Sequence, residues 1–166
     1  MKKITFLILT LLASSSHSQS FDEYSTLDGV YYGTSFWVEK ENSITHDAVV
    51  VGYNENYDQF ASTYDAQYSG YASTQQTISP LGMATGDTLD ANEDGRMDFI
   101  TAGIDTTSNA VINLYTQNTD GSFNETTLPM NGISNGKIKT GDLNHDGHAD
   151  FVVMAMSSGS NYIAKL

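Results

Sequence analysis

A nine-residue pattern, Asp-x-Asn-x-Asp-Gly-x-x-Asp, occurs twice in the chain, at residues 90–98 and 142–150. The five specified positions are identical in both copies, and the second copy begins 52 residues after the first. Each copy is followed by a run of residues that favour strands, 99–103 in one case and 151–155 in the other. A repeated loop with repeated flanks indicates stacked structural units, because each copy then encodes the same supersecondary element.

The chemistry of this pattern suits calcium, which takes six to eight oxygen ligands at about 2.3–2.6 Å. The expected ligands are the side chains at positions one, three, five and nine, together with a carbonyl at position seven that the glycine allows to turn inward. The two predicted calcium sites are Asp90, Asn92, Asp94 and Asp98 with the Arg96 carbonyl, and Asp142, Asn144, Asp146 and Asp150 with the His148 carbonyl. The alternative is a metal-free turn, but carboxylates crowded on nine residues would repel one another without a cation.

Other calcium-binding architectures fit the pattern poorly. An EF-hand loop has an acidic residue at position twelve and a helix on each side, whereas position twelve here is Thr101 or Val153. Dockerin modules share that arrangement, and thrombospondin-type calcium repeats are rich in Cys, which this chain lacks. No segment shows a convincing 3.6-residue apolar period, so no substantial helix is expected. Four short strands in a repeat of roughly 50 residues is the content of one propeller blade.

An upstream segment, residues 39–47, aligns with the two loops as a decayed third copy. Asp47 takes the ninth position, and Glu39, Glu41 and Ser43 are further oxygen donors. The glycine at position six is missing, so the backbone reversal that turns a carbonyl inward is not encoded. We expect weak metal binding at this segment, or none.

The second loop and its flanks, residues 141–153, resemble the core of an FG-GAP/VCBS-type repeat, the blade unit also found in integrin α-subunit propellers. The resemblance covers residues 86–166 well and residues 28–85 faintly. It implies a blade whose loop binds calcium as a structural ion. The expected fold is all-β, a partial β-propeller of about three four-stranded blades, with degenerate N-terminal blade(s) at 21–85 and calcium-binding repeats at 86–166.

The number of expected blades is low for a propeller, because closed propellers have four to eight. Three explanations stay open: a fragment of a longer gene product, several chains that together complete one ring, or an open stack of blades. We favour a fragment or partial propeller. An open stack would expose an edge strand, which invites pairing with another chain, so a homo-oligomer is a further hypothesis.

The N-terminus has the order of a bacterial-type export signal, predicted at residues 1–20. Lys2 and Lys3 precede an apolar stretch, residues 4–13, and a Ser-rich run follows. The apolar stretch is shorter than the about 20 residues that span a bilayer, so no membrane span is expected. Removing the signal would leave five basic and 20 acidic residues, 5 − 20 = −15. That charge argues against nucleic acid as a partner and favours divalent cations. The export signal predicts a secreted, periplasmic or cell-surface location.

The resemblance implies propellers that serve adhesion, or the recognition of protein or carbohydrate ligands, or that accompany extracellular enzymes. We therefore expect an exported calcium-binding module for extracellular binding or adhesion; the alternative is a non-catalytic accessory module or fragment of a secreted hydrolase. No catalytic motif is found, so the chain is not expected to be an enzyme. Aromatic residues are concentrated in the N-terminal half. Candidates for an exposed ligand patch are Trp37, Tyr64, Tyr68 and Tyr71, although strands also favour aromatic residues for packing.

Overall fold

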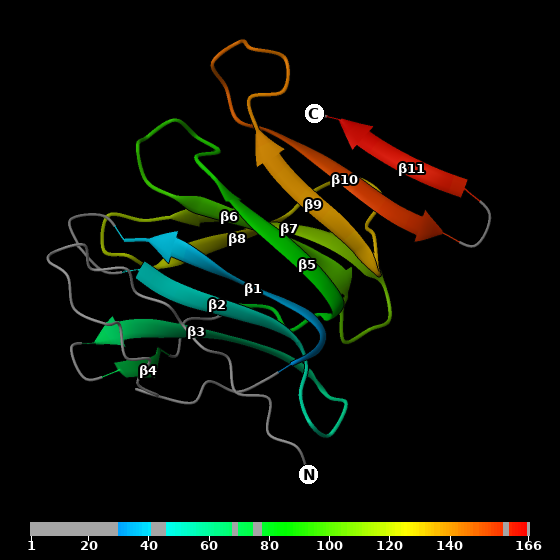
Figure 1. The fold of residues 1–166 in the computed structure, drawn as a ribbon, viewed down its shortest axis with the longest axis horizontal. Helices are drawn as coiled ribbons and strands as arrows, with labels where there is room; N and C mark the ends of the chain where they lie inside the picture. Colours follow the sequence, from blue (N-terminus) through cyan, green and yellow to red (C-terminus); the bar gives the residue numbers. More distant parts are fainter. Residues whose placement is uncertain (1–29, 41–45, 68–69, 75–77, 158–159, 166) are drawn as a thin grey trace, which may run out of the picture.

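A computed structural model describes residues 30–40, 46–67, 70–74, 78–157 and 160–165, and all regular structure in them is β (Figure 1). The predicted all-β class is confirmed. Among these residues there is no helix long and apolar enough to cross a membrane. The predicted signal at residues 1–20 lies outside the described part of the chain.

The strands of the described chain form three antiparallel sheets, each in sequential order along the chain. The first sheet contains β1 (Tyr31–Glu39), β2 (His46–Tyr53), β3 (Gln59–Gln67) and β4 (Gly70–Thr74). The second sheet contains β5 (Gly82–Leu89), β6 (Asp98–Ile104), β7 (Ala110–Gln117) and β8 (Phe123–Thr127). The third sheet contains β9 (Gly136–Gly141), β10 (Asp150–Ser157) and β11 (Ser160–Lys165).

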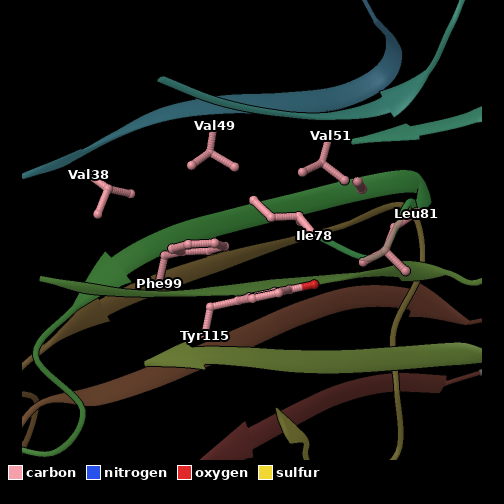
Figure 2. Close-up of a cluster of buried hydrophobic side chains, with 8 residues drawn as sticks. Val38, Val49, Val51, Ile78, Leu81, Phe99 and Tyr115 are labelled. Atoms are coloured by element: carbon pink, nitrogen blue, oxygen red, sulfur yellow. The ribbon is translucent and has the colours of Figure 1, made fainter. Parts of the chain in front are cut away.

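The three sheets pack face to face, with the first strand of each in contact with the first strand of the next (Figure 1). β6 is buried on both faces, because successive side chains of a strand point to opposite sides. Phe99 packs toward the first sheet in one apolar cluster, and Ile100 packs toward the third sheet in another. Figure 2 shows the first of these clusters, which contains Val38, Val49, Val51, Ile78, Leu81, Phe99 and Tyr115.

Backbone conformation repeats from sheet to sheet. Tyr32, Met83 and Asn135 lie at the start of the three first strands, at offsets of 51 and 52 residues, and have positive φ angles of 47°, 49° and 50°. The turns after β2 and β6 are equivalent in the same way, with φ of 62° at Tyr57 and 66° at Ser108. Residues other than glycine rarely adopt this conformation. The internal repeat therefore extends into the first sheet, in the register that the sequence alignment of residues 39–47 predicts.

Glutamine side chains connect the first and second sheets at opposite ends. Gln59 of β3 donates from Nε2 to the carbonyls of Ile104 at 3.1 Å and Asp105 at 2.8 Å. Gln117 of β7 donates from Nε2 to the carbonyl of Glu39 at 2.9 Å. Because each bond satisfies a main-chain carbonyl of the neighbouring sheet, the two sheets are held in one register.

The third sheet has a face that points away from the second sheet. Met154 of β10 lies on it and is 63% exposed. The residues at the equivalent positions of the other two sheets, Ala102 and Val51, are both 0% exposed because the next sheet covers them. The face around Met154 thus has the position of an interface between sheets.

Candidate metal centre

Both copies of the nine-residue pattern join the first strand of a sheet to its second strand. Residues 90–98 connect β5 to β6, and residues 142–150 connect β9 to β10. The two loops project from the same end of the molecule (Figure 1). β5 also contacts β9, so the strands that carry the loops are neighbours.

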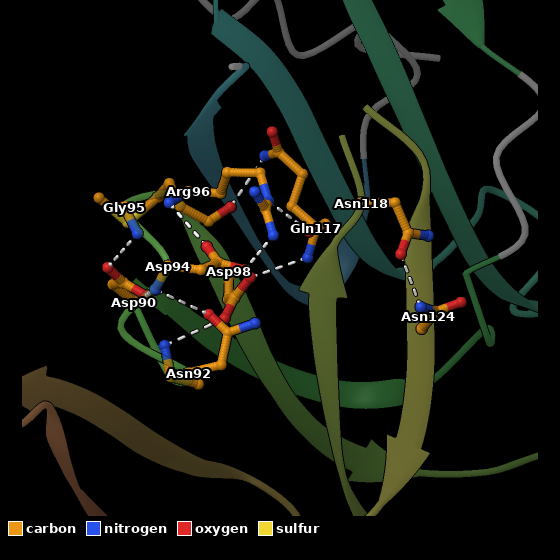
Figure 3. A network of polar contacts seen from close by, with 11 residues as sticks. Asp90, Asn92, Asp94, Gly95, Arg96, Asp98, Gln117, Asn118 and Asn124 are labelled. Carbon is orange, nitrogen blue, oxygen red and sulfur yellow. Dashed lines mark hydrogen bonds and ion pairs between the residues drawn. The ribbon is translucent and has the colours of Figure 1, made fainter. Parts of the chain in front are cut away.

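The first residue of each loop organises the backbone around its carboxylate. Asp90 accepts N–H bonds from Asp94 at 3.2 Å and Gly95 at 3.0 Å, as Figure 3 shows. Asp142 accepts the equivalent bonds from Asp146 at 3.1 Å and Gly147 at 3.0 Å. Two loops that differ at four of nine positions therefore share one hydrogen-bond framework.

Glycine at position six is explained by the backbone conformation. Gly95 and Gly147 have φ angles of 82° and 89°, in the left-handed region that glycine adopts without steric cost. Position four is also left-handed, with φ of 60° at Glu93 and 62° at His145. The reversal predicted from the sequence is thus present in both loops.

The side chains at positions three and five continue the framework. The Oδ1 atoms of Asn92 and Asn144 accept the N–H of position five at 3.2 and 2.9 Å. The Oδ1 atoms of Asp94 and Asp146 accept the N–H of position seven, both at 2.9 Å. The N–H bond from His148 is the main cause that lowers the pKa of Asp146. The side chains at positions one, three and five therefore bind the backbone of their own loop, on the surface of the molecule.

The ninth residue of each loop is a buried aspartate at the start of the second strand. Asp98 is 0% exposed and accepts N–H bonds from Gln117 at 2.8 Å and Ala91 at 3.0 Å. Asp150 is 7% exposed and accepts the N–H of Leu143 at 3.0 Å. Burial raises the pKa of Asp98, while the two N–H bonds act in the opposite direction. This position closes the loop against its own sheet.

The donor set fits calcium in its chemistry, because every predicted ligand is a hard oxygen atom. The described side chains do not, however, bring three or more His, Asp or Glu residues together as a metal-binding group. The second oxygen of position five already has a partner in each loop: Arg96 forms an ion pair with Asp94, and Asn144 Nδ2 donates to Asp146 at 2.8 Å. Carboxylate oxygens have two lone pairs and can accept an N–H while binding a cation. These contacts at position five are therefore compatible with a cation bound to the same carboxylates.

Comparison with known proteins agrees with the loop geometry. Residues 90–153 match the family described as the FG-GAP-like repeat. This segment is an FG-GAP-like repeat. The match begins at the first residue of the first loop and ends in β10, after the second loop. A search of curated proteins gave no match to the chain. The resemblance predicted from the sequence is confirmed over these residues, and FG-GAP repeats imply that the sheets are propeller blades.

The two loops of the FG-GAP-like repeat contact each other through their side chains. His148 Nδ1, at position seven of the second loop, contacts Glu93 Oε1, at position four of the first. This contact raises the pKa of His148. The imidazole of His148 is therefore directed to the neighbouring loop. Sequence reasoning missed Glu93, because nothing in a single loop pattern indicates which loops are neighbours.

The aromatic candidates lie outside the FG-GAP-like repeat and have different environments. Trp37 is 42% exposed on β1. The expectation that Tyr64 is exposed is wrong: it is 5% exposed and packs in a cluster with Ala48 and Val50 of β2. The cause is the strand register, which places Tyr64 opposite the small Ala48. Tyr68 lies outside the described residues, and Tyr71 belongs to β4 but its side chain is not described.

A different aromatic group is exposed at the end of the first sheet opposite the Glu39–His46 connection. Tyr31, Tyr32 and Tyr57 are 42%, 70% and 68% exposed. The rings of Tyr31 and Tyr57 are stacked, with centroids 5.8 Å apart. The signal that could have found Tyr57 is its place in a polar turn, residues 54–58, where an aromatic side chain has no core to enter.

Proposed function

We propose that the chain is an exported, calcium-binding, propeller-type module that binds an extracellular protein or glycan, with calcium in a structural role. The observation that carries this proposal is the shared framework of two neighbouring loops in an FG-GAP-like repeat. Export rests on the sequence order of residues 1–20. A calcium ion in each loop would neutralise carboxylates that are otherwise held close together.

Calcium would be held by the predicted ligands. Its effect on the fold would depend on the contacts that those ligands make with the strands. The ninth residue is attached to the second strand and, in the first loop, to β7 through Gln117. Drawing Asp98 toward a cation would therefore stiffen the contact between two strands of one sheet. A ligand that binds only the folded chain stabilises it, by about 2.7 kcal/mol per site at a hundredfold excess over Kd.

The proposed ligand surface is the exposed tyrosine group, Tyr31, Tyr32 and Tyr57. Two of these tyrosines have left-handed backbones, which cost residues with a side chain of order 1–2 kcal/mol. The equivalent positions in the second and third sheets include Ser108 and Asn135. The left-handed backbone is shared by the repeat, whereas, among the described side chains, the exposed tyrosine rings are particular to the first sheet. Such rings with hydroxyl groups suit sugars and protein surfaces alike.

The uncovered face of the third sheet supports a second proposal, that the chain is part of a larger propeller or a homo-oligomer. Met154 stands where the other sheets bury a residue against a neighbour. In that case the chain could be the non-catalytic accessory module of a secreted hydrolase. Mass measurement in solution separates the possibilities, since a monomer excludes the homo-oligomer.

The test of the calcium role is a calorimetric calcium titration of the chelator-treated chain. Two binding events, with a melting temperature that rises with calcium, are expected. No binding would reject the calcium role.

The test of the ligand surface is binding to a glycan array and to soluble oligosaccharides, for the wild type and two variants. Tyr32→Asn and Tyr57→Ser introduce the residues that the fold itself uses at equivalent positions, Asn135 and Ser108. Both variants should therefore fold. Loss of binding in both is expected, and binding that survives both substitutions would exclude this surface.

A further inference from the structure

The loop between β1 and β2 ends, like the other two loops, in a buried aspartate. Asp47, Asp98 and Asp150 occupy the same position at offsets of 51 and 52 residues, and they are 0%, 0% and 7% exposed. A buried carboxylate needs hydrogen-bond donors or a cation to offset the loss of its hydration. The three sheets can therefore be compared by how each satisfies this group.

The first sheet satisfies its buried aspartate, Asp47, differently from the other two sheets. In the other two loops the ninth aspartate accepts the N–H of the residue at position two, Ala91 or Leu143, at 3.0 Å. Among the described residues, no backbone N–H donates to either oxygen of Asp47. Instead, the ammonium group of Lys40 lies 3.2 Å from Asp47 Oδ2. Lys40 is the residue at position two of its loop. Its ammonium group therefore takes the place of the backbone N–H that the residue at position two donates in the other two loops.

The surroundings of Lys40 hold its ammonium group in place. Its Nζ atom also lies 3.4 Å from Asp65 Oδ1 of β3, and its side chain is 20% exposed. Its aliphatic stem passes Gly121 in the turn after β7, where an added Cβ would meet Lys40 Cε at 3.7 Å. The ammonium group is thus placed between carboxylates from β2 and β3, beside the second sheet.

Burial by itself disfavours an ionised Asp47, so the ion pair with Lys40 needs its own account. Desolvation raises the pKa of Asp47, and Lys40 is the main group that lowers it. Removing one partner of a buried ion pair is strongly destabilising, whereas replacing both partners by neutral groups costs little. Asp47 is therefore tolerated in its ionised form because of Lys40.

We propose that the first sheet has an internal cation site, in which the ammonium group of Lys40 does for Asp47 what a divalent ion does for the loops of the FG-GAP-like repeat. The comparison with calcium rests on the proposed function; the assignment of Lys40 to Asp47 does not. A tethered ammonium group needs no free ligand, so the first sheet is independent of divalent metal. The chain then takes two calcium ions and not three, and chelation loosens the second and third sheets first.

The test is hydrogen–deuterium exchange of the full chain with calcium and with chelator, followed in peptides from β2, β6 and β10. In the wild type, chelator is expected to speed exchange in β6 and β10 and to leave β2 unchanged. Lys40→Met should speed exchange in β2 by about tenfold or more in both conditions. The matched control is Lys137→Met, which removes an exposed lysine of β9.

A double variant separates loss of the ion pair from simple misfolding. Lys40→Met combined with Asp47→Asn removes both charges, and β2 should regain most of its protection. Equal exchange in Lys40→Met and Lys137→Met would overturn the proposal, as would a double variant no better than Lys40→Met. If no calcium binds at all but Lys40→Met still exposes β2, the calcium role fails and the assignment of Lys40 is supported.

Discussion

Asp98 accepts a hydrogen bond from the backbone N–H of Gln117 at 2.8 Å, and this contact joins a candidate calcium ligand to the interface between two sheets. The side chain of the same glutamine donates to the carbonyls of Met97 and Glu39, both at 2.9 Å. Glu39 ends β1 of the first sheet. A change in the loop is therefore transmitted to the neighbouring sheet through Gln117.

Substitution of Gln117 by Met should destabilise the chain by about 2–3 kcal/mol. The side chain is 2% exposed, and Met keeps its length but cannot donate to the two carbonyls. Buried acceptors without a donor cost about 1–3 kcal/mol each. Urea unfolding gives the difference, and Thr126→Ala on the exposed strand β8 is the control. A loss no greater than that of the control would mean that water replaces the amide.

Substitution of Asp94 or Asp146 by Ala should each remove one calcium site. Both residues hold the backbone of position seven, whose carbonyl is a predicted ligand. Each variant should bind one calcium ion by calorimetry and lose the corresponding part of the thermal stabilisation by calcium. Asp47→Ala should leave calcium binding nearly unchanged. Equal loss of calcium at all three positions would contradict the separate role of the first sheet.

The loops and the strands beside them were predictable because their signals are local. Glycine at position six requires a left-handed backbone, and Gly95 and Gly147 have one. The run of strand-favouring residues at 99–103 predicts a strand, although burial on both faces becomes clear only when the neighbouring sheets are present. The upstream copy could be aligned because Asp47 and the apolar run after it keep their spacing.

The contacts between strands and between loops could not be predicted, because they join residues distant in sequence. Lys40 has no pattern that points to Asp65, and Glu93 and His148 belong to separate loops. Tyr64 was assigned to the surface because a strand pattern rich in aromatic residues does not show which face is covered. Register and sheet order decide such cases, and a single sequence determines them weakly.

Truncation of Phe99 should be far more damaging than truncation of Met154. Phe99 is 0% exposed and stacks on Tyr115 with ring centroids 4.4 Å apart. Phe→Ala substitutions in cores cost about 3–5 kcal/mol, whereas exposed residues change stability by roughly 0.5 kcal/mol or less. Urea unfolding of Phe99→Ala and Met154→Ala measures both. A large, concentration-dependent loss in Met154→Ala would show that a second copy covers the third sheet.

The ionisation of Asp47 should make stability depend on pH in a defined direction. Burial, and to a smaller extent the nearby Asp65 carboxylate, raise its pKa above the ordinary value of 3.8, and Lys40 offsets this only in part. The folded chain therefore binds this proton more tightly than the unfolded chain does. The stabilisation from that proton is complete below the unfolded pKa and is lost as pH rises through the folded pKa.

Asp47→Asn has no such proton to lose. The unfolding free energy of Asp47→Asn minus that of the wild type should therefore rise from about pH 4 toward neutrality and then level off. Urea unfolding in chelator across this range measures it, because the two candidate calcium loops are identical in both proteins. A difference that falls as pH rises would mean that the folded pKa lies below the unfolded one. Attraction by Lys40 would then outweigh the burial of Asp47.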